Sequence, residues 1–140
     1  MVPEGTVLGF DFGQVRIGLA LGNTLTGTAR AYAVIDARSK RRWEAVAAAV
    51  AEWQPAALVV GVPRHPDGTA HEVTQMALRF ARQLAGRFRL PVYTVDERYS
   101  SVQAQSFDPD ADVIDDAAAA VILQQWFDEG CPQRTPEGLE

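Results

Sequence analysis

The sequence has little cysteine, and this narrows the classes of protein it can encode. Cys131 is the only cysteine, so no disulfide can form within the chain, and a thiolate zinc site would lack ligands. No run of about 18 apolar residues is present, which excludes a membrane-spanning helix. Residues 1–5 lack the basic and apolar regions of a signal peptide. We therefore expect a cytoplasmic protein in a reducing compartment.

Lysine is almost absent as well, and acidic residues outnumber basic ones. Lys40 is the only lysine among 13 basic residues, and the net charge is −5. The chain as a whole therefore lacks the excess of positive charge typical of nucleic-acid binders. The other basic residues are arginines, whose guanidinium groups bind phosphate through two parallel hydrogen bonds. Local phosphate-binding patches remain compatible with this composition.

Length and composition predict one domain. The chain has 140 residues, of which 47% are hydrophobic, and this is enough for a substantial core. Residues 131–140 are polar and rich in proline and glycine. We expect a single domain over residues 1–130, followed by a loose C-terminal tail over residues 131–140.

Apolar patterns along the chain predict several strands followed by alternating helices and strands. The predicted strands cover residues 7–13, 16–22, 29–35, 57–62 and 91–95, and the predicted helices cover residues 40–53, 73–88 and 113–128. Ser39 is expected to cap the first helix. Short connections favour antiparallel pairing of the first three strands, and helical crossovers make the later strands parallel. This predicts an α/β fold with a mixed five-stranded sheet, three strands antiparallel and two parallel, flanked by helices.

Three acidic residues stand where predicted elements begin or end. Asp11 lies between two phenylalanines in the first strand, where an unpaired buried charge would be costly. Glu97 follows the last strand, where open α/β sheets usually place ligand residues. Asp115 begins the last helix on one inward-facing stripe, and Asp116 extends another. The pattern alone does not choose between these last two residues.

Three carboxylates at one sheet edge would repel one another, and a divalent cation would remove that repulsion. Mg²⁺ and Mn²⁺ prefer oxygen ligands and keep open positions for water and phosphate oxygens. Two such ions can activate a water molecule and stabilise the leaving oxygen of a phosphodiester. The alternative from the residues alone is a set of unrelated surface groups, with Glu97 paired to Arg98 and Asp115 capping its helix.

Four ordered blocks of sequence resemble one protein family and span about residues 7–127. The blocks are Gly9-Phe10-Asp11-Phe12-Gly13 with Arg16-Ile17-Gly18-Leu19-Ala20, Val59-Val60-Gly61-Val62-Pro63 with Asp67-Gly68-Thr69, Asp96-Glu97-Arg98-Tyr99-Ser100-Ser101, and Asp115 with Ala118-Ala119 and Ile122-Leu123. This set is similar to the YqgF/RuvX family, whose members are described as Holliday-junction resolvases and as nucleases that mature the 5′ end of 16S ribosomal RNA. The resemblance implies a ribonuclease-H-like fold and a catalytic, metal-binding triad of Asp11, Glu97 and Asp115. The family spacing favours Asp115 over Asp116.

The chain departs from the family pattern in two places. Val15 stands where the family usually has a lysine, which removes one phosphate contact. Residues 106–112 form a short acidic segment, whereas relatives tend to be longer and basic there. The sequence therefore does not predict that residues 106–112 bind the substrate.

The densest basic run, Arg38-Ser39-Lys40-Arg41-Arg42, is a candidate for binding nucleic acid. Lys40, Arg41 and Arg42 fall in the first turn of the first predicted helix, where positive charge opposes the helix dipole. These residues are therefore not there to stabilise the helix, and we expect them to contact phosphates. The alternative is a solvated helix face.

Further candidates for substrate contacts stand beside the predicted triad. Arg16 is close to Asp11 in sequence and is expected to pair with a phosphate. Arg98, Tyr99 and Ser100 follow the last strand, where they can contact the substrate or cap a helix.

The sequence therefore predicts an endonuclease that uses Mg²⁺ or Mn²⁺ to hydrolyse phosphodiester bonds in structured nucleic acid. The substrate is either Holliday-junction DNA or the 5′ end of precursor 16S rRNA, and two symmetric cuts in a junction would require a homodimer. An alternative is a non-catalytic nucleic-acid-binding or ribosome-assembly factor with the same fold. The Asp11-Phe12-Gly13 turn also resembles that of the actin and sugar-kinase ATPases, but those need two lobes, and 140 residues have room for one.

Overall fold

The elements of the structure follow the order predicted from the sequence. The computed structural model describes residues 4–64, 72–98 and 113–135. Its elements are β1 (Thr6–Asp11), β2 (Arg16–Asn23), β3 (Thr28–Asp36), α1 (Arg42–Trp53), β4 (Ala57–Arg64), α2 (Glu72–Phe88), β5 (Val92–Arg98) and α4 (Val113–Asp128). None of the helices in these ranges is long and apolar enough to cross a membrane.

One sheet contains all the strands, in the spatial order β3-β2-β1-β4-β5. β1 pairs with β2, and β2 with β3, in antiparallel fashion through short connections. β4 pairs with β1, and β5 with β4, in parallel, since helices carry the chain back between them. The predicted mixed five-stranded sheet is therefore confirmed. β4 lies inside the sheet, and its fully buried run from Ala57 to Val60 explains the continuous apolar pattern there.

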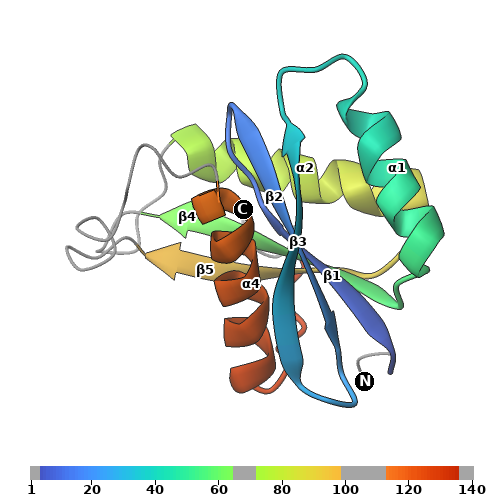
Figure 1. Ribbon diagram of the computed structural model, residues 1–140. Helices are drawn as coiled ribbons and strands as arrows, with labels where there is room; N and C mark the ends of the chain where they lie inside the picture. The colour runs from blue at the N-terminus through green and yellow to red at the C-terminus, as the bar shows by residue number, and fades with distance from the viewer. Residues whose placement is uncertain (1–3, 65–71, 99–112, 136–140) are drawn as a thin grey trace.

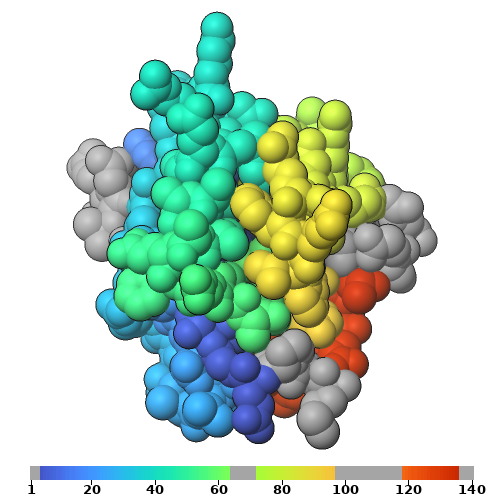
Figure 2. Space-filling view, turned by 90° about the vertical axis from the view of Figure 1, so that its right-hand side faces the viewer, coloured from blue at the N-terminus to red at the C-terminus, as the bar shows by residue number. Residues whose placement is uncertain are grey.

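Helices cover both faces of the sheet (Figure 1). On one face, Leu8 and Phe10 of β1 share a core with residues of α1 and α2 such as Val46 and Phe80. On the other face, Val7 of β1 belongs to a core that contains the buried side of α4. This division follows from the alternation of side chains along a strand. Figure 2 views the molecule from the side on which α1 and α2 lie next to each other.

Two glycines let α4 approach the sheet closely. A Cβ atom added at Gly9 of β1 would lie 2.9 Å from the Cβ of Leu123, and one added at Gly22 of β2 would lie 2.7 Å from Cε2 of Phe127. Any larger residue at these positions would push the helix away from the strands. The two contacts set the height and direction of α4 over β1 and β2.

Some boundaries differ from those predicted. β5 continues through Arg98, so Glu97 lies inside the strand and not beyond it. α1 begins at Arg42, and its N-cap residue, Arg41, makes no side-chain capping bond. Ser39 instead stabilises the preceding turn, because its hydroxyl accepts a hydrogen bond of 3.0 Å from the backbone N–H of Arg41. Ser100, which is expected to contact substrate or cap a helix, lies outside the described residues.

The stretch that follows α4 runs along β5. The backbone N–H of Thr94 donates to the carbonyl of Arg134 at 2.7 Å, and Nε1 of Trp126 donates to the carbonyl of Pro132 at 2.8 Å. Since β5 is an edge strand, this stretch satisfies a backbone donor that would otherwise face solvent. The division of the chain into a domain over residues 1–130 and a tail over residues 131–140 stays a prediction.

Candidate functional site

The predicted carboxylate positions on the strands lie at one edge of the sheet. Asp11 is the last residue of β1 and is paired in register with Gly61 of β4. Gly61 is in turn paired with Val95 of β5, two residues before Glu97. Because these three strands run parallel, their carboxyl ends meet at the same edge. Asp11 and Glu97 therefore stand near each other along this edge, with β4 between their strands.

Both strand positions belong to the face of the sheet that α4 covers. On β1, Val7 packs in the α4 core and Gly9 lies beneath Leu123, so Asp11 follows on the same face by alternation. On β5, Tyr93 and Val95 pack in the same core. Position 97 is two residues beyond Val95, so it falls on the same face of the strand by alternation. The side chains of Glu97, Arg98, Asp115 and Asp116 lie outside the described residues, so only their backbone positions are given.

α4 runs so that its first turn approaches this edge. Phe127 lies at Gly22, which is paired with Val7 near the start of β1, whereas Leu123 lies at Gly9. Residues nearer the start of α4 therefore lie over positions of β1 that are nearer Asp11. Asp115 precedes Leu123 by eight residues, a distance of roughly 12 Å at 1.5 Å per residue. The backbone at the third predicted position therefore lies over the same face of the sheet and toward the same edge.

The turn after Asp11 brings Arg16 to this edge as well. A Cβ atom added at Gly13 would lie 2.5 Å from the Arg16 carbonyl oxygen, so the turn requires glycine. β2 begins at Arg16 and runs antiparallel to β1, which places this residue near the end of β1. Asp36 is paired with Arg16 in register, and its pKa is held below the usual range, mainly by a hydrogen bond from the backbone N–H of Arg38 and with a small contribution from the Arg16 charge.

The other predicted nucleic-acid contacts are separated by the structure. Lys40 and Arg41 are exposed in the turn before α1, whereas Arg42 is half-buried and donates through Nη1 to the carbonyl of Ser39 at 3.2 Å. Arg98 ends β5 at the edge described above. Tyr99 and Ser100 lie outside the described residues.

Sequence reasoning missed one arginine, Arg79, that the fold brings to Arg38 and Arg42 of the basic run. Arg38, Arg42 and Arg79 all line a hollow of about 400 Å³ between the β1–β2 turn, α1 and α2. Arg79 is some forty positions further along the chain, on a helix where regularly spaced arginines look like an ordinary solvated face. No local pattern could have joined it to the basic run.

A metal centre is not visible in the side chains that the structure describes. Among them, no three histidine, cysteine, aspartate or glutamate residues group closely enough to hold an ion. Two of the three predicted ligands have side chains outside this set, so their role stays a prediction. The arrangement of the backbone is nevertheless compatible with a site at this edge.

Comparisons with known proteins agree on one family. The family model described as RuvX, Holliday junction resolvase, matches residues 5–129. A protein of Paraburkholderia xenovorans (strain LB400) named "Putative pre-16S rRNA nuclease" is 54% identical over 130 residues, which are 89% of each chain. A protein of Burkholderia vietnamiensis (strain G4) with the same name is 53% identical over 135 residues, 90% of this chain and 91% of that protein.

Solved structures show the same fold. Thermus thermophilus RuvC in complex with a Holliday junction substrate matches with a TM-score of 0.53 at 17% identity, over 92% of this chain and 98% of that one. A second structure of Thermus thermophilus RuvC matches with a TM-score of 0.53 at 15% identity. These likenesses confirm the ribonuclease-H-like fold implied by the sequence blocks. With the family model covering most of its length and relatives more than half identical to it, the chain belongs to the RuvX (YqgF) family.

Proposed function

We propose that this chain is a divalent-metal-dependent endonuclease that hydrolyses phosphodiester bonds in structured nucleic acid. The family and the names of the relatives are those of nucleases. The observation that supports the proposal most directly is that the backbone positions of Asp11 and Glu97 lie at one edge of the sheet and that α4, which begins near Asp115, starts toward the same edge. In this proposal the three carboxylates are the catalytic and metal-binding residues.

The residues at this edge fit a hard divalent cation. Carboxylate oxygens are the ligands that Mg²⁺ and Mn²⁺ prefer. Gly61 stands beside Asp11 on the neighbouring strand and offers no side chain to fill the space next to it. When bound, the ion would supply activation of water and stabilisation of the leaving oxygen. Asp11 and Glu97 belong to paired strands of one sheet, and sites built on strands are held more precisely than sites built on loops.

The chain's own cations would bind the substrate backbone. Arg16 at the β1–β2 turn, Arg98 at the end of β5, and the run Lys40, Arg41 and Arg42 are proposed to contact phosphates. Tyr99 and Ser100, which follow Arg98, are proposed to contact the nucleic acid near the cleaved bond. A nucleic-acid substrate also agrees with the cytoplasmic location expected from the sequence.

Two substrates share the chemistry of this site. The family description names Holliday junction resolution, and the relatives are named for precursor 16S rRNA. Cleavage of a junction by paired cuts would require a homodimer, whereas trimming of RNA would not. The acidic sequence of residues 106–112 favours a second candidate function, that of a nucleic-acid-binding factor that does not cleave.

One comparison tests the proposal. The purified protein is incubated with Mn²⁺ and either a four-way DNA junction or a fragment containing the 5′ end of precursor 16S rRNA. Wild type is expected to cleave at least one of them, and Asp11→Asn to lose activity by more than about 100-fold, because a ligand charge is removed. Asp128→Asn, at the far end of α4, is the matched control and should cleave like wild type. Binding of either substrate without cleavage would support the non-catalytic candidate instead.

A further inference from the structure

Three arginines from separate parts of the chain border the hollow between the β1–β2 turn, α1 and α2. Arg38 precedes α1, Arg42 is its first residue, and Arg79 belongs to α2. Gln14 and Gln83 also line the hollow and add amide groups that can donate hydrogen bonds. Its charged lining residues in the described chain are all arginines, so the hollow is strongly positive in a molecule whose net charge is −5.

The positive charge of these side chains is only weakly neutralised. Arg38 makes an ion pair with Asp36 at 3.5 Å, but its side chain is 69% exposed, and exposed pairs contribute little. Arg42 donates to the carbonyl of Ser39, a neutral acceptor that does not balance its charge. A ligand with negative charge would therefore gain more from this hollow than a neutral one.

The hollow lies just around the sheet edge from the proposed catalytic site. Phe12 lines it and directly follows Asp11. Phe12 packs against the core beneath α1 and α2, whereas Asp11 is on the α4 face. A nucleic-acid strand that crosses the end of β1 would therefore pass from one site to the other.

The aromatic residues of the hollow are already engaged in packing. The rings of Phe12 and Trp43 lie 5.2 Å and 5.4 Å from the ring of Phe80, centroid to centroid. The guanidinium of Arg87 lies over the Trp43 ring at 4.2 Å. These rings pack the β1–β2 turn and α1 against α2. The groups that can bind a ligand are therefore the arginines and amides. This favours a backbone phosphate over a stacked base.

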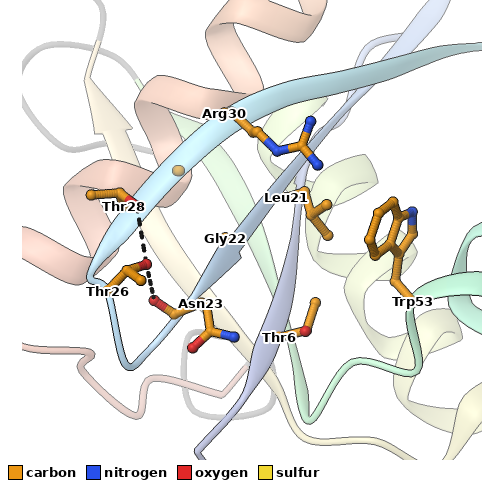
Figure 3. Close-up of a pocket in the computed structure, with 9 residues that line it drawn as sticks. Thr6, Leu21, Gly22, Asn23, Thr26, Thr28, Arg30 and Trp53 are labelled. Atoms are coloured by element: carbon orange, nitrogen blue, oxygen red, sulfur yellow. Dashed lines mark hydrogen bonds between the residues drawn. The ribbon is translucent and has the colours of Figure 1, made fainter.

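A second hollow provides a contrast at the other end of the sheet. It measures about 240 Å³ and is bordered by Thr6, Asn23, Arg30 and Trp53 among others (Figure 3). Arg30 is the one charged side chain among its described lining residues, and the start of β1 at Thr6 is remote from Asp11. Arg30 thus provides a matched position for removing one positive charge away from the proposed substrate path.

We infer that the hollow formed by Arg38, Arg42 and Arg79 is a phosphate subsite that holds the backbone of the substrate strand beyond the cleaved bond. The inference rests on the proposed function, because it takes nucleic acid as the ligand. It adds Arg79 to the residues expected to bind substrate and assigns Arg38 and Arg42 of the basic run to the same subsite. The shared ligand chemistry is the phosphodiester, whether it comes from DNA or RNA.

Binding is measured in an Asp11→Asn background, so that cleavage does not interfere, with a four-way DNA junction and with single-stranded precursor rRNA. The test variant is Arg38→Gln with Arg79→Gln, and the control is Arg30→Gln. Loss of two phosphate contacts should reduce the slope of log K against log salt by about 1.8 for duplex arms or about 1.4 for single strands. At 0.1 M salt this corresponds to weaker binding on the order of 10- to 100-fold. The control should change neither quantity.

The outcomes separate this inference from the proposed function. A slope and affinity equal to those of Arg30→Gln would overturn the subsite, and so would failure of the Asp11→Asn protein to bind either probe. Wild type that binds but does not cleave would overturn the nuclease while the binding result still decides the subsite. The probe whose binding changes more, DNA junction or precursor rRNA, identifies the nucleic acid that supplies the phosphate. Thermal melting of each variant shows that folding is retained, as expected for exposed side chains.

Discussion

Leu123 of α4 lies directly above Gly9 of β1, so close that a Cβ at position 9 would be 2.9 Å from the Leu123 Cβ. We expect Gly9→Ala to destabilise the fold by about 1–3 kcal/mol, because the clashing atom is held by the helix backbone and cannot rotate away. Urea unfolding measures this. Gly86→Ala is the control, since nothing lies within 4 Å of that site, and removing a helical glycine should stabilise by up to about 1 kcal/mol. Equal unfolding midpoints for the two variants would contradict the close approach.

Replacement by phenylalanine should lower the free energy of unfolding more at Trp126 than at Trp53. Trp126 is fully buried and donates to Pro132, whereas Nε1 of Trp53 is buried and has no hydrogen-bond partner among the described residues. Trp126→Phe should cost about 1–3 kcal/mol more than Trp53→Phe, because it leaves a carbonyl without its donor.

The reactivity of the Cys131 thiol measures loss of the hydrogen bond between Trp126 and Pro132. Cys131 is half-buried beside Trp126, and burial raises the pKa of its thiol. Releasing the stretch at Pro132 should expose this thiol, so Trp126→Phe should speed its reaction with a thiol reagent while Trp53→Phe should not. Because the chain has one cysteine, the readout is unambiguous. Unchanged labelling in Trp126→Phe would show that the Pro132 bond does not hold the stretch in place.

The lowered pKa of Asp36 should make the stability of the fold depend on pH in the acidic range. Its pKa lies below 3.8, chiefly because the carboxylate accepts a hydrogen bond from the Arg38 backbone N–H. The folded state therefore favours the ionised form, so the stabilisation is present above pH 3.8 and is lost as the pH falls through the folded pKa. An NMR titration should show the lowered pKa in wild type and also in Arg38→Gln, which keeps the backbone donor. A return to the ordinary value in Arg38→Gln would mean that the side-chain charge is the main cause.

The adjacent residues Asp115 and Asp116 should differ sharply in their effect on activity. If position 115 supplies a metal ligand, Asp115→Asn should lower Mn²⁺-dependent cleavage by more than about 100-fold and raise the Mn²⁺ concentration needed for half-maximal rate. Asp116→Asn, which makes the same chemical change one residue along, should keep most of the activity. The reverse result would move the third ligand to Asp116. Chelation by EDTA should abolish cleavage by wild type and by Asp116→Asn alike.

Much of the fold could be predicted from short-range patterns. The apolar run over residues 57–62 predicts a strand covered on both faces, and the last predicted helix, over residues 113–128, has the bounds of α4. Boundaries that depend on pairing were less accurate. β5 extends to Arg98 because β4 beside it continues to Arg64 and supplies hydrogen-bond partners, which the sequence of β5 does not reveal.

The candidate site divides in the same way. The sequence by itself determined the family, and it predicts the three carboxylates of the site, because motif blocks and strand ends are local features. Only the tertiary structure decided that the backbone positions of Asp11 and Glu97 lie at one sheet edge, since parallel register joins residues far apart in the chain. The hollow of Arg38, Arg42 and Arg79 likewise exists only after α1 and α2 pack on the sheet. Side-chain neighbours across helices depend on packing, and packing is a property of the whole fold and not of any local pattern.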